Sequence, residues 1–268
     1  MTNYQLGVIG AGNMAEALLR GALAAKVLDA RFVLVSDVSP ARRDLFTREF
    51  KVAAVDDNAA AAACPRLLLA VKPQIMPAVL ETVARVINAE TLVISIAAGI
   101  RTAQIAAQLA GRGRIVRVMP NTPLMAGMGA TALAGGAGAT PEDLDWTARL
   151  FASCGIAVSV SEREMDAVTA VSGSGPAYFF YLLEAMTAAG QAEGLDEATA
   201  LQLAIQTCRG AGELLFRTGQ KPQAARAKVT SPNGTTQAAI EALDKAGVKD
   251  ALVAAIRRAA ERSRELGS

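Results

Sequence analysis

The chain has 268 residues, with 27 basic and 25 acidic side chains, a net charge of +2, three cysteines and no histidine. The balanced charge gives no electrostatic footprint for nucleic acid, and the absence of histidine excludes Ser-His-Asp triads, Cys-His pairs and histidine-based zinc sites. The scattered Cys64, Cys154 and Cys208 predict reduced thiols that fill core space, so we expect no disulfide framework and no metal site. The length is comfortable for two domains.

The first half of the chain alternates short apolar runs with helical patterns. This alternation predicts an α/β domain with a doubly wound, parallel sheet. We expect strands at residues 5–9, 32–35, 67–71, 92–96 and 115–118, and further strands at 130–134 and 156–160. Helices are expected at residues 14–25, 40–50, 77–87, 102–109 and 141–153.

The first apolar run leads into the loop Gly10-Ala11-Gly12-Asn13-Met14-Ala15. The two glycines let the backbone turn and approach a pyrophosphate, the small Ala15 lets helix pack on strand, and the helix N-terminus faces the phosphates. About 20 residues beyond the glycines, the second apolar run ends in Ser36-Asp37, where a ribose-binding acid is expected. These features predict a dinucleotide-binding Rossmann domain.

Strand patterns stop near residue 164, and alanine-rich helical patterns follow at residues 165–190, 196–218, 222–229, 235–246 and 248–266. We therefore expect a Rossmann domain over residues 1–162 and an all-α domain over residues 163–268. Small side chains bury little area each, so a helical unit of this kind gains stability by packing against a partner. The sequence predicts a homodimer at least.

A polar turn, Ser231-Pro232-Asn233-Gly234-Thr235-Thr236, opens directly into one of these helices. The first amides of a helix have no partner inside it, and together with the threonine hydroxyls they suit a small anion such as a carboxylate. The alternative is that one threonine merely caps the helix.

With four further segments, these motifs resemble the pyrroline-5-carboxylate reductase family over essentially the whole chain. The segments that carry the resemblance are residues 10–15, 70–74, 95–99, 117–123, 172–178 and 229–236. The family usually has glycine at the position of Asn233, and asparagine also enters left-handed turns. The resemblance implies hydride transfer from NAD(P)H to 1-pyrroline-5-carboxylate, which gives L-proline in the last step of proline biosynthesis, without a strong acid or base.

The resemblance also implies roles for individual residues. The amides of Gly234, Thr235 and Thr236 would hold the substrate carboxylate, the Thr236 hydroxyl would orient the ring nitrogen as the catalytic group, and Glu162 aligns with a substrate-site position. Ser172–Pro176 would form the floor near the nicotinamide. The implied cofactor-binding residues are Gly10, Ala11, Gly12, Asn13, Met14, Ser36, Asp37, Asn58, Ala70, Val71, Lys72, Pro73, Ala98, Met119, Pro120 and Asn121. Two alternatives stay open: Asn58 as a helix cap, and Lys72 as an ordinary solvated lysine.

The sequence gives opposing indications about the cofactor. Asp37 would bind a free ribose hydroxyl and repel a 2′-phosphate, which favours NADH. If Asp37 serves as a turn residue instead, Ser36, Arg42 and Arg43 favour a phosphate. Because the family commonly uses NADPH, we expect NADPH, with NADH as the open alternative.

No signal peptide precedes Gly10 and no apolar stretch reaches membrane length, so we expect a cytoplasmic protein without membrane or nucleic-acid partners. The family's larger rings extend the expected homodimer to a decamer. The sequence disfavours two other functions. A beta-hydroxyacid dehydrogenase needs a catalytic lysine where this chain has Phe179, and a non-catalytic NAD(P)-sensing protein needs no carboxylate site.

Overall fold

The computed structural model describes residues 4–267, which form two compact units. The first unit comprises the chain up to Ser174 together with residues 259–268, and the second comprises Gly175–Arg258. The first unit extends beyond the boundary predicted between residues 162 and 163, because Met165 packs with Ala132 and Ala134 of the sheet. The boundary predicted from the sequence therefore stays a prediction about functional domains.

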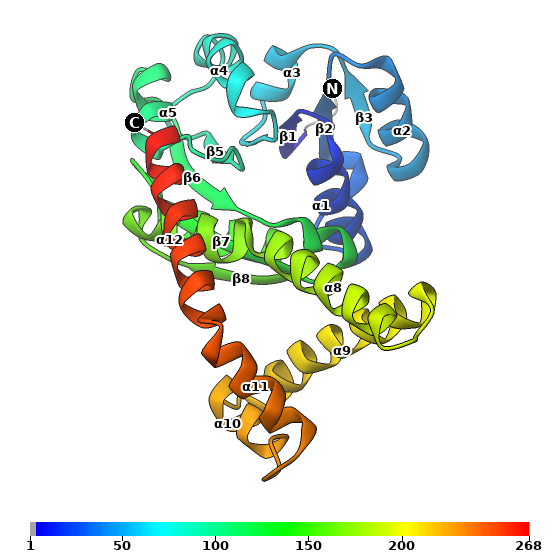
Figure 1. Cartoon of the computed structure of the whole chain (residues 1–268). Helices are drawn as coiled ribbons and strands as arrows, with labels where there is room; N and C mark the ends of the chain where they lie inside the picture. The colour runs from blue at the N-terminus through cyan, green and yellow to red at the C-terminus, as the bar shows by residue number, and fades with distance from the viewer. Residues whose placement is uncertain (1–3, 268) are drawn as a thin grey trace. The chain divides into compact units, whose positions relative to one another are not determined.

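An eight-stranded sheet forms the centre of the first unit (Figure 1). Its strands are β1 (Leu6–Ile9), β2 (Val33–Ser36), β3 (Ala53–Val55), β4 (Arg66–Leu69), β5 (Leu92–Ser95), β6 (Arg114–Met119), β7 (Gly129–Gly135) and β8 (Gly155–Ser159). Their order is β3-β2-β1-β4-β5-β6-β7-β8. The first six strands of this order are parallel, as predicted.

The last two strands, whose direction the sequence did not predict, depart from the parallel arrangement. β7 runs antiparallel to β6, and β8 runs parallel to β7. The short β6–β7 connection holds only a 3-10 turn, Thr122–Ala126, and a parallel neighbour would need a longer crossover. The sequence also gave no sign of β3, because its three small, half-buried residues carry little apolar signal.

Helices cover both faces of the sheet, so its strands are apolar on both sides. The helices of this unit are α1 (Asn13–Ala24), α2 (Pro40–Phe50), α3 (Asn58–Ala62), α4 (Met76–Ala84), α5 (Thr102–Gln108), α6 (Pro141–Ala152) and α7 (Met165–Val168). Leu18, Phe46 and Phe151 of α1, α2 and α6 share one core with Leu68. Leu80 of α4 and Ile105 of α5 lie in a second core with Leu67 and Leu69. Each such fully buried side chain contributes about 1.5–3 kcal/mol.

The thiols lie where the sequence predicted them, in the interior. Cys64 and Cys154 are buried, Cys208 is half-buried, and all three are free. Burial raises the pKa of the Cys64 thiol to about 11, because the interior disfavours its thiolate. Cys64 is therefore inert at neutral pH.

The end of helix α12 (Val248–Leu266) belongs to the first unit. The Ser263 hydroxyl donates to Oδ1 of Asp166 at 2.6 Å, and Leu266 lies beside Gly99 after β5. Figure 1 shows this last turn of the chain, in red, next to α5. The last turn of α12 thus packs against the segment that follows the carboxyl end of β5.

The second unit contains α8 (Gly175–Ala192), α9 (Glu197–Thr218), α10 (Pro222–Lys228), α11 (Thr235–Lys245) and the first part of α12. The predicted helix at residues 165–190 is interrupted by a π-helical turn at Thr169–Gly173. In α9 only Ala200 and Ala204 are buried. Large apolar side chains remain exposed instead, among them Phe179, Phe180, Tyr181, Leu203 and Phe216. Such an exposed apolar surface indicates an interaction site.

Within residues 4–267, no helix combines the length and the apolar character that crossing a membrane requires.

Candidate functional site

The glycine loop after β1 is built by the approach of two backbone segments. Gly10 has φ of 99°, and a side chain there would meet the Ala70 carbonyl oxygen at 2.7 Å, so the fold itself requires glycine. Gly12 differs, because its φ of −73° suits any residue and a Cβ there would meet nothing within 4 Å. The space in front of Gly12 is therefore free for a ligand to approach the backbone.

The start of α1 presents unpaired donors to that space. Gly12 is the N-cap of α1 and provides no side chain to cap it. The amides of Asn13, Met14 and Ala15 donate to no acceptor in the described part of the chain. Free amides and the positive end of the helix dipole suit a phosphate group.

Asp37 ties the glycine loop to the end of β2. Its Oδ2 accepts from the Ala11 amide at 2.7 Å and its Oδ1 accepts from the Ser39 amide at 2.8 Å. Of the two roles that the sequence left open for Asp37, ribose binding and turn formation, the structure has the turn role. Each of its carboxylate oxygens accepts a hydrogen bond from a backbone amide.

Arg42 and Arg43, at the start of α2, bring positive charge to the same edge. Arg42 binds the Ala11 carbonyl and pairs with Glu16 at 2.7 Å. The hydrogen bond from Arg42 is the main cause that holds the pKa of Glu16 below its usual range, against the desolvation of the carboxyl. Arg43 donates to the Asp37 carbonyl at 2.8 Å. Two guanidinium groups thus flank the carboxyl end of β2.

Ser36 and Asn58 are brought together from β2 and α3. The Ser36 hydroxyl, which is buried, donates to Oδ1 of Asn58 at 2.8 Å. The interpretation of Asn58 as a helix cap is wrong, because Asp57 caps α3 by accepting from the Ala59 amide. The Asn58 side-chain amide nitrogen remains available as a donor beside β2.

The segments after β4 and β5 lie at the same edge of the sheet. The Ala70 amide donates to the Ile9 carbonyl at 2.8 Å, and Val71 lies in contact range of Gly10. Lys72 is exposed, and Pro73 begins a 3-10 turn directly behind it. Ala98 is exposed after β5. All five predicted cofactor residues, Ala70, Val71, Lys72, Pro73 and Ala98, follow parallel strands, where open sheets bind their ligands.

The segment after β6 approaches the π-helical turn. Met119 contacts the position where Gly173 has no side chain, since a Cβ there would lie 2.5 Å from the Met119 methyl group. Asn121 is buried, its Nδ2 donates to the Ser172 carbonyl at 3.1 Å, and its Oδ1 accepts from the Ala130 amide at 2.9 Å. Pro120 is buried between them. Asn121 therefore fixes the geometry of this edge with both ends of its amide.

Glu162 forms a pair that the sequence did not reveal. Its Oε1 accepts from Arg117 at 2.8 Å, and Arg117 is only 3% exposed. The same oxygen lies 3.4 Å from the Thr102 amide at the start of α5, and Oε2 is buried without a partner in the described residues. Arg117 lies inside an apolar strand, so no spacing signal could have linked it to Glu162.

The predicted substrate residues lie in the second unit, at the start of α11. Gly234 is the N-cap, so the alternative that a threonine caps this helix is wrong. The amides of Thr235, Thr236 and Gln237 donate to no acceptor among the described residues. Asn233 has φ of 60°, the left-handed geometry expected of it. Three free amides and the Thr236 hydroxyl are thus presented together.

Across residues 4–267, no three Cys, Asp or Glu side chains gather closely enough to hold a metal ion.

Comparison with known proteins assigns both halves of the chain. Residues 5–99 match the family model described as NADP oxidoreductase coenzyme F420-dependent. Residues 162–266 match the family model described as pyrroline-5-carboxylate reductase dimerisation.

Similar proteins span the chain almost from end to end. The pyrroline-5-carboxylate reductase of Methanosarcina acetivorans is 41% identical over 268 residues, which is 100% of this chain and 99% of that protein. The enzyme of that name from Pisum sativum is 37% identical and covers 98% of this chain and 96% of its own.

Solved structures agree with these relatives. The structure of a pyrroline-5-carboxylate reductase from Coxiella burnetii has a TM-score of 0.94 and 33% identity, with 99% of both chains covered. The Plasmodium falciparum pyrroline carboxylate reductase, solved with NADP bound, has a TM-score of 0.87 and 29% identity, with 100% of both chains covered. The chain therefore belongs to the pyrroline-5-carboxylate reductase family.

Proposed function

We propose that this protein reduces 1-pyrroline-5-carboxylate to L-proline with NADPH, the last step of proline biosynthesis. The observation that carries the proposal is the start of α11, where Gly234 leaves three amides free beside Thr236, in a chain 41% identical to a reductase of that name. Loss of NADPH absorbance with freshly prepared pyrroline carboxylate tests it directly. Absence of turnover by the purified oligomer would contradict it.

The residues of the first unit fit a dinucleotide. The open space at Gly12 admits the pyrophosphate to the free amides of Asn13 and Met14. Ala11 contributes its backbone, and Ser36 with Asn58 lies at the ribose end. Beyond them, the segments with Ala70, Val71, Lys72, Pro73, Ala98, Met119, Pro120 and Asn121 line the route toward the nicotinamide. When bound, the reduced nicotinamide supplies hydride to the imine carbon.

The guanidinium groups at the end of β2 favour NADPH, although Arg42 is paired with Glu16 at 2.7 Å and Arg43 lies 3.7 Å from Asp56. Both oxygens of Asp37 are engaged by backbone amides, whereas the guanidinium groups of Arg42 and Arg43 lie at the edge where a 2′-phosphate would arrive. Guanidinium groups bind phosphate through charge-assisted hydrogen bonds. The family model that matches this half is also named for NADP.

The start of α11 fits the substrate. The amides of Thr235, Thr236 and Gln237 would hold its carboxylate at the positive end of the helix, and the Thr236 hydroxyl would orient the ring nitrogen. The Gly234 amide, which the sequence predicted as one of the donors, instead donates to the Ser231 carbonyl at 3.1 Å. A protonated imine is already electrophilic, so positioning supplies most of the rate and no strong acid is needed. Glu162 is proposed as a further substrate-binding residue through its unpartnered Oε2.

Neither alternative function has comparable support. A beta-hydroxyacid dehydrogenase would need a lysine at Phe179, whose ring is 57% exposed and has no proton to exchange. A non-catalytic sensor would have no use for the free amides of α11. We also propose that the protein acts in the cytoplasm as a homodimer at least, and that dimers assemble up to a decamer.

Gly7 and Gly12, in and after β1, should respond differently to substitution. Gly12→Val should abolish NADPH binding in a fluorescence titration yet keep the wild-type melting temperature, because the new side chain fills ligand space only. Gly7→Ala should instead destabilise the apo protein by about 1–3 kcal/mol, since its Cβ would meet the Ala61 carbonyl oxygen at 1.9 Å. Unchanged NADPH titration in Gly12→Val would refute this assignment of the loop.

Cofactor preference should depend on Arg43. Removal of one charge-assisted hydrogen bond costs roughly 1.5–3 kcal/mol, so Arg43→Ala should raise KM for NADPH about 10- to 100-fold and leave KM for NADH nearly unchanged. Arg48→Ala, an exposed change at the other end of α2, is the matched control. A wild-type KM that is much lower for NADH than for NADPH would reverse the proposed preference.

The Thr236 hydroxyl should contribute to turnover. We expect Thr236→Ala to lower kcat by about 10- to 100-fold, one hydrogen bond and some misalignment, while Thr236→Ser retains most activity. Thr230→Ala serves as control, because the Thr230 hydroxyl donates to the Arg226 carbonyl outside the proposed site. Wild-type kcat in Thr236→Ala would remove this residue from the reaction.

The exposed apolar faces of α8 and α9 predict association. Sedimentation equilibrium should show no populated monomer at micromolar concentration. Charged substitutions at Tyr181 and Phe216, which are 75% and 73% exposed, should produce monomers if these side chains lie in the interface. A wild-type protein that sediments as a monomer would contradict the proposed dimer.

A further inference from the structure

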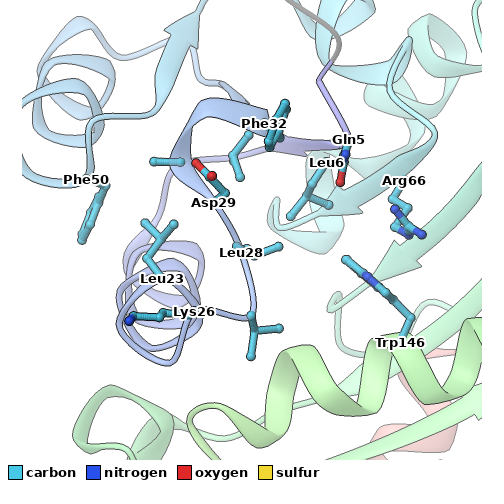
Figure 2. A pocket seen from close by; sticks show the side chains of 13 residues that line it. Gln5, Leu6, Leu23, Lys26, Leu28, Asp29, Phe32, Phe50, Arg66 and Trp146 are labelled. Carbon is cyan, nitrogen blue, oxygen red and sulfur yellow. The ribbon is translucent and has the colours of Figure 1, made fainter.

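A cavity of about 620 Å³ lies at the amino end of the parallel strands. Leu6 of β1, Val33 of β2 and Arg66 of β4 line it, and each stands at the first position of its strand. The glycine loop and the segments assigned to the cofactor follow the opposite, carboxyl ends of these strands. The cavity is therefore separate from the site described above (Figure 2).

Arg66 occupies an unusual position for a cation. In the register it pairs with Leu6 and Leu92, two members of the first core, and Leu68, two residues along the strand, is fully buried in that core. Because side chains alternate along a strand, Arg66 continues the inward-facing row of β4. Arg66 is half-buried, and this burial lowers the pKa of its guanidinium.

The guanidinium lies 4.7 Å from the centre of the Trp146 ring. Figure 2 shows Arg66 over the indole at one side of the cavity, with Leu6, Leu28 and Gln5 nearby. A guanidinium that stacks on an aromatic face keeps its N–H groups in plane, where they can bind a carboxylate at two points. No described residue accepts a hydrogen bond from this side chain.

The neighbouring carboxylates are engaged elsewhere. Asp143 holds Arg114 with both oxygens, at 2.7 and 3.0 Å, and accepts from the Thr140 amide as well. Asp29, which lines the cavity, is held by Arg31 at 2.6 Å. Lys26 adds a second positive charge to the lining. The cavity thus combines an apolar floor with an excess of positive charge.

We propose that this cavity binds a small organic carboxylate with an apolar body. The carboxylate would accept two hydrogen bonds from the Arg66 guanidinium, and the apolar body would lie against Leu6, Leu28 and Trp146. The site is independent of the proposed reduction, so binding here and turnover there stand or fall separately.

Trp146 is the only tryptophan of the chain and lines this cavity, so a ligand bound here should change its emission. Because Trp146 also lines a second pocket beside Arg149, the Arg66 variants below assign the change to this cavity. We would titrate the purified oligomer with 3-phenylpropionate, in the presence of excess L-proline to keep the substrate site occupied. The expected result is a saturable change in emission. The neutral analogue 3-phenylpropionamide, which has nearly the same shape, should bind at least about 10-fold more weakly, because it lacks the charge that strengthens the hydrogen bonds to Arg66.

Substitutions of Arg66 test whether 3-phenylpropionate binds in this cavity. Arg66→Gln should weaken binding about 10-fold or more, and Arg66→Lys should weaken it less. Arg112→Gln, at an exposed arginine outside the cavity, is the matched control. Equal binding by acid and amide, no saturable signal in the wild type, or unchanged binding by Arg66→Gln would each overturn the proposal. If Arg66→Gln fails to fold, the comparison of acid with amide on the wild type decides alone.

Discussion

The hydrogen bond from the Ala11 amide to Asp37 is the constraint on which the cofactor edge depends. It fixes the glycine loop against the end of β2, and the second oxygen of Asp37 holds the Ser39 amide that precedes α2. Both oxygens of the Asp37 carboxylate are therefore directed at backbone amides. Arg42 and Arg43 follow on α2 and bind backbone carbonyls of the same two segments. One carboxylate thus holds together the two segments to which both arginines also bind.

The two units are stabilised in different ways. In the first unit, two layers of helices bury large side chains such as Phe46 and Phe151 against the sheet, which is a complete core. In α9 of the second unit the buried residues are alanines, while Phe216 of α9 and Phe180 of α8 remain exposed. The second unit therefore leaves an apolar surface of the kind that marks an interaction site.

Local signals in the sequence predicted most of the fold, and contacts between distant residues were beyond them. The glycines of the first loop, the proline at the start of α2 and the asparagine at the left-handed turn each determine structure over a few residues. Pairs such as Arg117 with Glu162, or Asn121 with Ser172, join residues 45 and 51 positions apart and leave no periodic trace. β3 was missed because Ala53 and Ala54 have low strand propensity. The antiparallel direction of β7 was missed because it follows from the short turn at Thr122–Ala126, whose conformation the sequence did not reveal.

In the candidate site, side chains mostly hold backbone segments in place, and main-chain amides are left free for ligands. Asp37 and Asn121 are committed to holding backbone segments, and Ser36 donates to Asn58. The groups left free are largely main-chain amides, at the start of α1 and again at the start of α11. Backbone amides do not titrate near neutral pH, and their direction is fixed by the helix that follows. A chain without histidine can therefore hold two anionic ligands firmly and leave the electrophilic character to a protonated imine, as long as the helices that carry the amides are themselves held in place.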